Sequence, residues 1–187
     1  MVTILNISGK AQHGKDTLAE MVGDLLQVKG YKVQTIHFAD SLKEEAVRDC
    51  GWDGEKDKCG RGLLQDLGTY KRENVDIDYW VKRAEEKFKE DSDFILIPDT
   101  RYENEIGYFR GKPRYRVITI RIERWENGKL FDNGLTPEQK AHSSEVSLDN
   151  YIFDYRLQVN SGYHNLMDTA THLVRSLVGE AGTFESY

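Results

Sequence analysis

A glycine-rich loop between an apolar run and an amphipathic segment constrains the fold of this chain more than any other feature of its sequence. Val2–Ser8 (VTILNIS) is a β-branched run typical of a buried strand. The next residues, 9–17 (GKAQHGKDT), space their glycines and lysine as GxxxxGK. Apolar residues then recur at helical spacing through Thr17–Val28. A strand, a GxxxxGK loop and a helix in this order predict a phosphate-binding loop.

Each residue type in this loop suits phosphate for a physical reason. Glycines such as Gly9 and Gly14 let the backbone curl and point N–H groups at phosphate oxygens. The N-terminus of the following helix adds about half a positive charge. Lys15 would bridge the terminal phosphates and stabilise the charge that develops during phosphoryl transfer. The other predicted nucleotide contacts in this loop are Lys10, His13, Asp16 and Thr17.

One position departs from the usual pattern. Asp16 stands where Ser or Thr normally ligates Mg²⁺, and Thr17 follows one residue later. An aspartate here could hold Mg²⁺ through water or orient the acceptor, although it also brings negative charge close to the phosphates. The alternative is a glycine-rich turn in which Asp16 only caps the helix.

The rest of the chain alternates apolar runs with amphipathic segments. Further strands are predicted at Val33–Phe38, Asp93–Pro98, Arg116–Ile122 and Tyr155–Val159. Further helices are predicted at Ser41–Arg48, Leu63–Arg72, Tyr79–Lys89, Glu103–Arg110 and Tyr163–Val178. This alternation implies an α/β fold with a parallel five-stranded sheet flanked by helices. Because such sheets bind ligands at the carboxyl ends of their strands, functional residues are expected directly after each strand.

Charged residues follow the second and third predicted strands. Asp40 and Lys43 would emerge at the ligand-binding edge of the sheet, or they are a helix cap and a solvated lysine. Asp99 follows an apolar strand, the arrangement that places a carboxylate near Mg²⁺, and Arg101 could clamp a phosphate with two hydrogen bonds. The alternative for this pair is a salt-bridged strand end.

The last two strands lead into polar segments. The fourth strand ends Arg121-Ile122-Glu123-Arg124 and runs into a polar stretch, 123–145, which is expected to be a long mobile loop. Such a loop could act as a lid that supplies arginines and excludes water, or these arginines belong to an exposed basic turn. After the fifth strand, Asn160 and Gly162 form a turn beside the phosphate loop that suits a nucleobase edge, or is an ordinary helix start.

An amphipathic stretch lies between the second and third strands. It reads RGLLQDLGTYKR over residues 61–72, with leucines on one side. Two arginines and an amide in such an insertion suit an acceptor phosphate and its base, although a plain surface helix is the alternative. The candidate residues are Arg61, Gln65, Arg72 and, in the next helix, Trp80.

Composition limits the number of domains, the partners and the cellular compartment that we expect. The 187 residues favour one domain, and 26 basic against 32 acidic residues give a net charge of −6, which excludes a strongly basic footprint for bulk nucleic acid. Neither a leader nor a membrane-spanning run is expected. Two cysteines are too few for a disulfide framework, so we expect reduced thiols and a cytoplasmic protein. Residues 179–187 are expected to fray.

Seven segments together resemble the bacteriophage-type deoxynucleoside monophosphate kinases. In chain order they are SGKAQHGKDT, FADSLK, RGLLQDLGTYKR, DYWVKR, PDTRYENE, HSSEVSLD and YRLQVNSG, from Ile7 to about Gly162. The resemblance implies a single P-loop kinase domain over 1–187, with an acceptor-binding helical insertion at about 41–90 and a lid at about 123–145. It also implies transfer of the ATP γ-phosphate to a deoxynucleoside monophosphate with Mg²⁺, in the host cytoplasm if the protein is phage-encoded.

The resemblance also suggests roles for the candidate residues. Lys15, Asp16, Asp99 and Arg101 form the expected catalytic set. Mg²⁺ is expected at Asp16, Thr17 and Asp99, and ATP at the loop, Arg121, Asn160 and Gly162. The acceptor is expected at Asp40, Lys43, Arg61, Gln65, Arg72, Trp80, Arg101 and Glu145. No general base is required, because a monophosphate oxygen is already anionic.

Other functions remain open at this point. A related kinase could phosphorylate another small metabolite or a hydroxymethylated base in phage DNA. A nucleotide-dependent switch is disfavoured, since no glycine follows Asp99 in a DxxG pattern and no NKxD occurs. The expected partners are small nucleotides, with a homodimer left open and no membrane or bulk nucleic acid.

Overall fold

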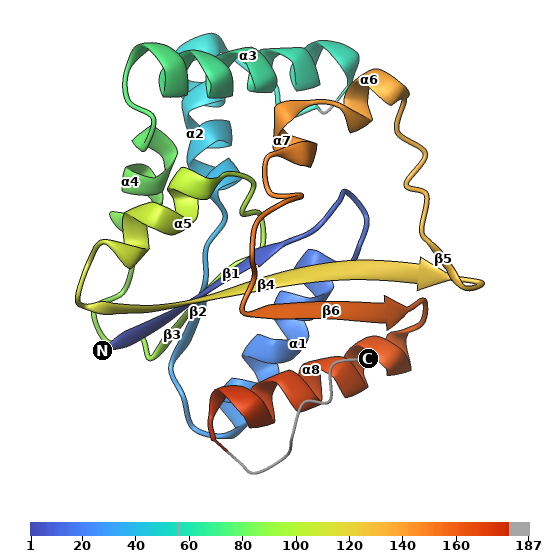
Figure 1. Cartoon of the computed structure of the whole chain (residues 1–187). Helices are drawn as coiled ribbons and strands as arrows, with labels where there is room; N and C mark the ends of the chain where they lie inside the picture. The colour runs from blue at the N-terminus through green and yellow to red at the C-terminus, as the bar shows by residue number, and fades with distance from the viewer. Residues whose placement is uncertain (56, 180–187) are drawn as a thin grey trace.

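Parallel strands form the centre of the fold. The computed structural model describes residues 1–55 and 57–179 of the chain. In this part, the parallel strands run in the order β2-β3-β1-β4-β6, and the short β5 pairs antiparallel with the end of β4 (Figure 1). The strands are β1 (Val2–Ser8), β2 (Val33–Thr35), β3 (Phe94–Ile97), β4 (Tyr115–Glu126), β5 (Lys129–Leu130) and β6 (Tyr155–Asn160). The helices are α1 (Lys15–Val28), α2 (Phe38–Cys50), α3 (Lys58–Asn74), α4 (Tyr79–Glu85), α5 (Glu103–Arg110), α6 (Pro137–Lys140), α7 (Ser143–Val146) and α8 (Tyr163–Leu177).

Helices cover both faces of the sheet (Figure 1). On one face, Leu18 and Val22 of α1 pack in the same cluster as Leu173 of α8. On the other, Val81 of α4 and Phe109 of α5 pack against the strands. Each of these side chains is at most 1% exposed, and burying one stabilises the fold by about 1.5–3 kcal/mol. The α/β fold with a mostly parallel sheet is therefore confirmed.

Buried polar residues lie at the carboxyl end of β1 and in the part of β4 that pairs with it. Asn6 and Ser8 close β1, and each is at most 2% exposed. Their register partners on β4 are Thr119 and Arg121, which are also buried. These polar residues lie toward the edge of the sheet from which the predicted phosphate loop continues.

The second strand is shorter than predicted. β2 ends at Thr35, and Phe38, which we expected in the strand, begins α2. The Asp99 carboxylate accepts the N–H groups of Phe38 and Ala39, so the helix starts before the predicted Ser41. The Phe38 side chain is also buried in the cluster beneath α4. These long-range contacts override the local strand pattern.

The prediction of a loop over 123–145 is wrong at its beginning. Residues 123–126 continue β4, and a turn at Asn127 and Gly128 leads into β5. Both turn residues have positive φ angles, 52° and 74°, which are typical of tight hairpin turns. Pairing with β6 extends β4 as far as Trp125, so a neighbouring strand stabilises a segment that is polar in sequence. The short helices α6 and α7 follow.

Several smaller expectations can be compared with the structure. α1 begins at Lys15, earlier than expected, and α4 ends at Glu85, earlier than the predicted Lys89. Cys50 and Cys59 are free and exposed. Within the described residues, no helix has both the length and the apolar character needed to cross a membrane. The expected fraying concerns a tail whose residues 180–187 lie outside the described part.

Candidate active site

The predicted phosphate loop joins β1 to α1. Gln12 and Gly14 have positive φ angles of 62° and 88°, so the backbone curls between Gly9 and the first turn of the helix. A Cβ atom on Gly9 would lie 2.6 Å from the carbonyl oxygen of Ile122, so this close approach of two strands requires glycine. Because α1 starts at Lys15, its first N–H groups adjoin the loop.

Lys15 is buried within the loop. Its side chain is only slightly accessible, with the residue 7% exposed, and Nζ donates a hydrogen bond to the Lys10 carbonyl oxygen at 2.9 Å. The pKa of Lys15 is lowered to about 8, chiefly because the ammonium group is buried; the nearby cations Arg101 and Arg121 also lower it, while Glu145 opposes the change. The ammonium group is thus charged at neutral pH and sits where the GxxxxGK pattern predicts phosphate.

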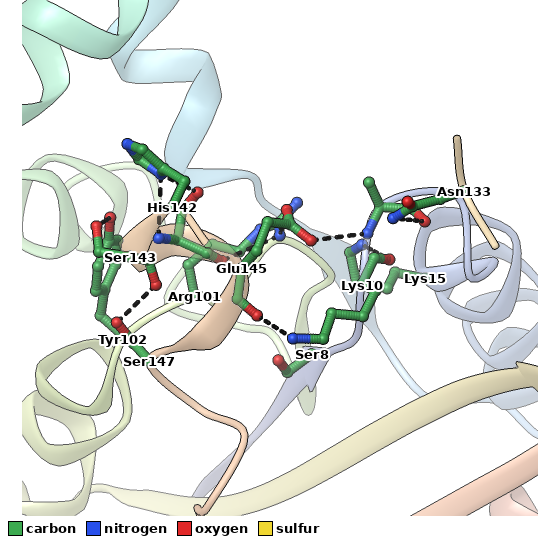
Figure 2. Close-up of polar contacts among 12 residues, drawn as sticks. Ser8, Lys10, Lys15, Arg101, Tyr102, Asn133, His142, Ser143, Glu145 and Ser147 are labelled. Atoms are coloured by element: carbon green, nitrogen blue, oxygen red, sulfur yellow. Dashed lines mark hydrogen bonds and ion pairs between the residues drawn. The ribbon is translucent and has the colours of Figure 1, made fainter. Parts of the chain in front are cut away.

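Glu145 of α7 bridges the phosphate loop and Arg101. Its Oε1 lies 2.5 Å from Nη1 of Arg101, and its Oε2 accepts the Ala11 N–H at 3.2 Å. The backbone carbonyl of Glu145 also accepts a hydrogen bond from Lys10. Figure 2 shows Glu145 between Arg101 and the loop residues Lys10 and Lys15. A carboxylate therefore lies at the junction of the loop and the arginine that follows β3.

The Asp149 carboxylate forms ion pairs with Lys10 and Arg121, two residues that were predicted from the sequence to contact ATP. Its Oδ1 lies 2.7 Å from Lys10 Nζ and 2.9 Å from Arg121 Nη2. Arg121 is 6% exposed and also donates to Ser8 Oγ. In the structure both cations pair with the segment that follows α7, and their predicted contact with ATP stays a prediction.

Asp16, His37, Asp40 and Lys43 form a chain of polar contacts on the α2 side of the loop. His37 Nε2 lies 3.0 Å from Asp16 Oδ1, and His37 Nδ1 lies 3.6 Å from Asp40 Oδ2. Lys43 pairs with Asp40 at 3.1 Å. The Asp16 side chain is largely exposed, so it is available to solvent beside Lys15. Asp40 and Lys43 thus pair with one another, and their predicted contact with an acceptor stays a prediction.

Asp99 holds the start of α2. Its two oxygens accept the N–H groups of Phe38 at 3.1 Å and Ala39 at 2.9 Å. Burial raises the pKa of Asp99, and the two N–H groups oppose that rise. Each oxygen retains a lone pair, so the predicted contact with Mg²⁺, direct or through water, stays a prediction.

The donor set suits a loosely held magnesium ion. Within the described residues, no group of three or more His, Cys, Asp or Glu side chains is arranged to hold a metal. Mg²⁺ in phosphoryl-transfer sites usually takes one or two protein oxygens, with water and phosphate completing its shell. The oxygen donors predicted for it are Asp16 and Thr17, in the first turn of α1, and Asp99, which follows β3.

A cavity of about 980 Å³ opens between α2, α3 and the segments 99–105 and 142–144. The Arg72 guanidinium lies 3.2 Å from the centroid of the Tyr102 ring on the cavity wall. Trp80 is buried, and its indole N–H donates to the Gly68 carbonyl. Leu42 adds apolar surface. The predicted acceptor residues that line this cavity are Gln65, Arg72, Trp80 and Arg101.

Other predicted residues lie outside this cavity. Arg61 is exposed on α3 and is not among its lining residues. Asn160 and Gly162 lie where β6 passes into α8, with the Asn160 carbonyl accepting from Asn165. Their predicted contact with the nucleobase stays a prediction.

His13 ties the phosphate loop to β4. Its imidazole Nδ1 accepts the Arg124 N–H at 3.1 Å, and burial lowers the pKa of His13. Arg124 in turn lies over the Phe131 ring at 3.9 Å and donates to Ser161. The His13 side chain therefore ties the loop to β4, and its predicted contact with ATP stays a prediction.

Sequence reasoning missed Tyr102, Glu105 and Asp149. All three belong to segments that were singled out, PDTRYENE and HSSEVSLD, so their positions carried a signal. The sequence did not indicate which residues they contact, because those contacts form only when the chain folds. Glu105, for example, is buried and accepts two backbone N–H groups.

Comparison with known proteins identifies the fold. No family model matches the sequence, and no curated protein sequence matches it. The shikimate kinase of Acinetobacter baumannii, solved with shikimate, has a TM-score of 0.51 and 14% identity, covering 98% of this chain and 96% of its own. The APS kinase of Mycobacterium tuberculosis, solved with AMPPNP and APS, has a TM-score of 0.49 and 13% identity, covering 95% and 98%. At these identities the likeness shows the fold alone: the chain shares with the shikimate kinase an α/β fold whose mostly parallel sheet is flanked by helices.

Proposed function

We propose that this chain is an ATP-dependent kinase whose acceptor is a deoxynucleoside monophosphate. The observation that carries the proposal is the position of Arg101, which lines the large cavity and reaches Glu145 at the phosphate loop. One guanidinium thus adjoins both the place predicted for the transferred phosphate and the place predicted for the acceptor. The sequence resemblance to deoxynucleoside monophosphate kinases supports the same acceptor class.

The loop residues account for ATP. Backbone N–H groups of residues 9–16 and the Lys15 ammonium suit the β- and γ-phosphates. Mg²⁺, held through Asp16, Thr17 or Asp99, would neutralise charge on those phosphates. The buried position of Lys15 strengthens its interaction with phosphate, because water screens the charge less there.

The cavity suits a nucleoside monophosphate. Its volume of about 980 Å³ lies at the upper end of the range for small-molecule sites. Arg101 and Arg72 both line it, and guanidinium groups bind a phosphate dianion through paired hydrogen bonds. Leu42 and Trp80 offer apolar surface for a base. An acceptor phosphate on the arginines would therefore point toward the loop.

Transfer would need positioning more than proton chemistry. An anionic oxygen of the acceptor phosphate attacks the γ-phosphorus, and the bond from that phosphorus to the bridging oxygen of ADP breaks. Lys15 and the loop N–H groups stabilise the charge that develops on the leaving oxygen. Arg101 holds the acceptor close to the reacting phosphorus.

An acceptor screen tests this proposal. The purified chain is incubated with ATP, Mg²⁺ and each nucleoside or deoxynucleoside monophosphate, and the products are separated by chromatography. We expect at least one diphosphate, and Lys15→Ala should lower its rate on the order of 10²–10³-fold. Lys89→Ala, at an exposed position, is the matched control and should leave the rate unchanged. No turnover with any monophosphate would refute the proposal.

The position of Glu145 favours a second candidate function. Its carboxylate adjoins the loop and could accept the proton of a hydroxyl acceptor, such as a small metabolite or a hydroxymethylated base in DNA. Glu145→Gln separates the two functions. A phosphate acceptor needs no base, so its rate should stay within about tenfold, whereas a hydroxyl acceptor should lose about 10²–10⁴-fold.

A further inference from the structure

A buried carboxylate holds the backbone turn that carries Arg101. Glu105 lies in the first turn of α5 and is 6% exposed. Its Oε2 accepts the N–H of Arg101 at 2.6 Å and the N–H of Tyr102 at 3.0 Å. Two consecutive N–H groups on one oxygen restrict the backbone from which both side chains leave.

Those two side chains lead to two arginines. Arg101 extends to the carbonyl of Ser144, at 3.2 Å, and to Glu145 beside the phosphate loop. The Tyr102 ring supports the Arg72 guanidinium at 3.2 Å. The Glu105 carboxylate therefore fixes the backbone from which the Arg101 side chain leaves. It also fixes the backbone of Tyr102, whose ring contacts the Arg72 guanidinium.

The opposite ends of these side chains are anchored to the segment around α7. The Tyr102 hydroxyl lies 3.2 Å from Ser143 Oγ, and the two residues lie side by side in Figure 2. Arg101 reaches Ser144 and Glu145 in the same segment. Because the far ends are tied to α7, a shift of the 101–102 backbone would change both contacts together.

A carboxylate is a costly choice at this buried position. The pKa of Glu105 is raised to about 7, chiefly because the carboxyl group is buried; the negative charge of Asp99 also raises it, while the backbone N–H groups and Arg72 oppose the change. An apolar side chain would avoid the desolvation of a carboxylate but could not accept the two N–H groups. Glu105 thus accepts two backbone hydrogen bonds that an apolar side chain of similar size could not accept.

We propose that Glu105 is a positioning residue for the acceptor phosphate, because it fixes the Arg101–Tyr102 backbone and through it both arginines that face the cavity. The inference rests on the proposed kinase function, which identifies the acceptor as a monophosphate. Glu105 acts through Arg101 and Tyr102.

Kinetics of three variants test the proposal. Glu105→Ala should lower kcat/KM for the monophosphate roughly 10–100-fold, because displacement of a binding group by about 1 Å has effects of that size. The KM for ATP should stay within about threefold, since the loop itself is unchanged. Glu105→Gln keeps an oxygen that can accept both N–H groups and should recover most of the loss. Glu103→Ala, on the exposed side of the same helical turn, is the control.

Amide hydrogen exchange provides a readout that needs no turnover. The Arg101 and Tyr102 amides should exchange slowly in the wild-type protein and in Glu105→Gln, and at least about tenfold faster in Glu105→Ala. Exchange in β3 should not change. Glu105→Asp, whose shorter side chain cannot span the same distance, replaces the alanine variant if that one fails to fold.

The outcomes distinguish this inference from the proposed function. If the wild-type protein phosphorylates no monophosphate, the proposed function fails and the exchange measurement alone decides the role of Glu105. Equal losses in the glutamine and alanine variants, or unchanged exchange in the alanine or aspartate variant, would overturn the inference. An equal rise in the KM of ATP and of the acceptor would also overturn it, because that indicates a general structural role.

Discussion

The Lys10 ammonium lies 2.7 Å from both carboxylate oxygens of Asp149, and this ion pair ties the phosphate loop to the segment that follows α7. Arg121 donates to the same carboxylate at 2.9 Å. A negative charge from that segment therefore lies against the loop, close to the place predicted for ATP phosphates. Asp149 organises two cations and partly cancels their attraction for a polyanion.

Asp149→Asn should strengthen ATP binding. The amide oxygen can still accept hydrogen bonds from Lys10 or Arg121, while the negative charge is removed. At low salt the Kd for ATP should fall about two- to fivefold, the effect of one partly exposed charge. Isothermal titration calorimetry at two salt concentrations measures it.

The effect of salt identifies the cause. In about 0.5 M salt the difference between Asp149→Asn and wild type should shrink, because exposed charges are screened. Glu90→Gln, an exposed charge removed from the chain elsewhere, should have little effect at either concentration. Weaker ATP binding by Asp149→Asn would show instead that the ion pair is needed to shape the loop.

Activity should depend on the charge of Lys15. Its pKa in the folded protein is about 8, below the ordinary value of 10.5, and the charged form is the one that holds phosphate. In the free enzyme, kcat/KM for ATP should fall as pH rises through about 8, approaching tenfold per unit. Bound phosphate favours the ammonium form, so kcat itself should fall only at higher pH.

Lys15→Arg is the control for this pH dependence. A guanidinium stays charged throughout the range, so the fall near pH 8 should disappear even if the absolute rate is lower. The same shift predicts that stability rises with pH between about 8 and 10.5, because the unfolded chain binds more protons there. An unchanged pH profile in Lys15→Arg would assign the fall to another group.

Glu105 should make the fold less stable as pH rises toward neutrality. Its folded pKa of about 7 exceeds the ordinary value of 4.5, so its contribution is fully present below about 4.5 and is lost as pH rises through 7. The shift corresponds to at most about 3 kcal/mol. Thermal unfolding at pH 5 and pH 7.5 should show a loss of stability in the wild-type protein that is smaller in Glu105→Gln. Equal losses in both proteins would contradict the prediction.

Gly9→Ala should destabilise the phosphate loop. The added Cβ would meet the Ile122 carbonyl oxygen at 2.6 Å, and backbone on both sides must move to accommodate it. We expect a loss of about 1–3 kcal/mol in urea unfolding, together with weaker ATP binding. Gly107→Ala is the control, because nothing lies within 4 Å of its added Cβ and an alanine inside a helix stabilises by about 0.5–1 kcal/mol. Equal stability of the two variants would contradict the expected clash.

The first strand, the phosphate loop and the first helix could be predicted from the sequence because their signals are local. The β-branched run of β1, the GxxxxGK spacing and the periodicity of α1 all lie within residues 2–28. Alternation of the later elements predicted the α/β class for the same reason. Places where a distant partner decides the structure were predicted less well, such as the start of α2 at Phe38 and the extension of β4 to Glu126.

The sequence by itself determined that this chain builds a GxxxxGK loop between a strand and a helix of a parallel α/β fold, because strand, turn and helix propensities act over neighbouring residues. Only the tertiary structure decided what the carboxylates do. Asp99 binds N–H groups of α2 that lie about 60 positions away, and Asp149 pairs with Lys10 across 139 positions. Hydrogen bonding and burial depend on distances in space, which the order of residues does not specify.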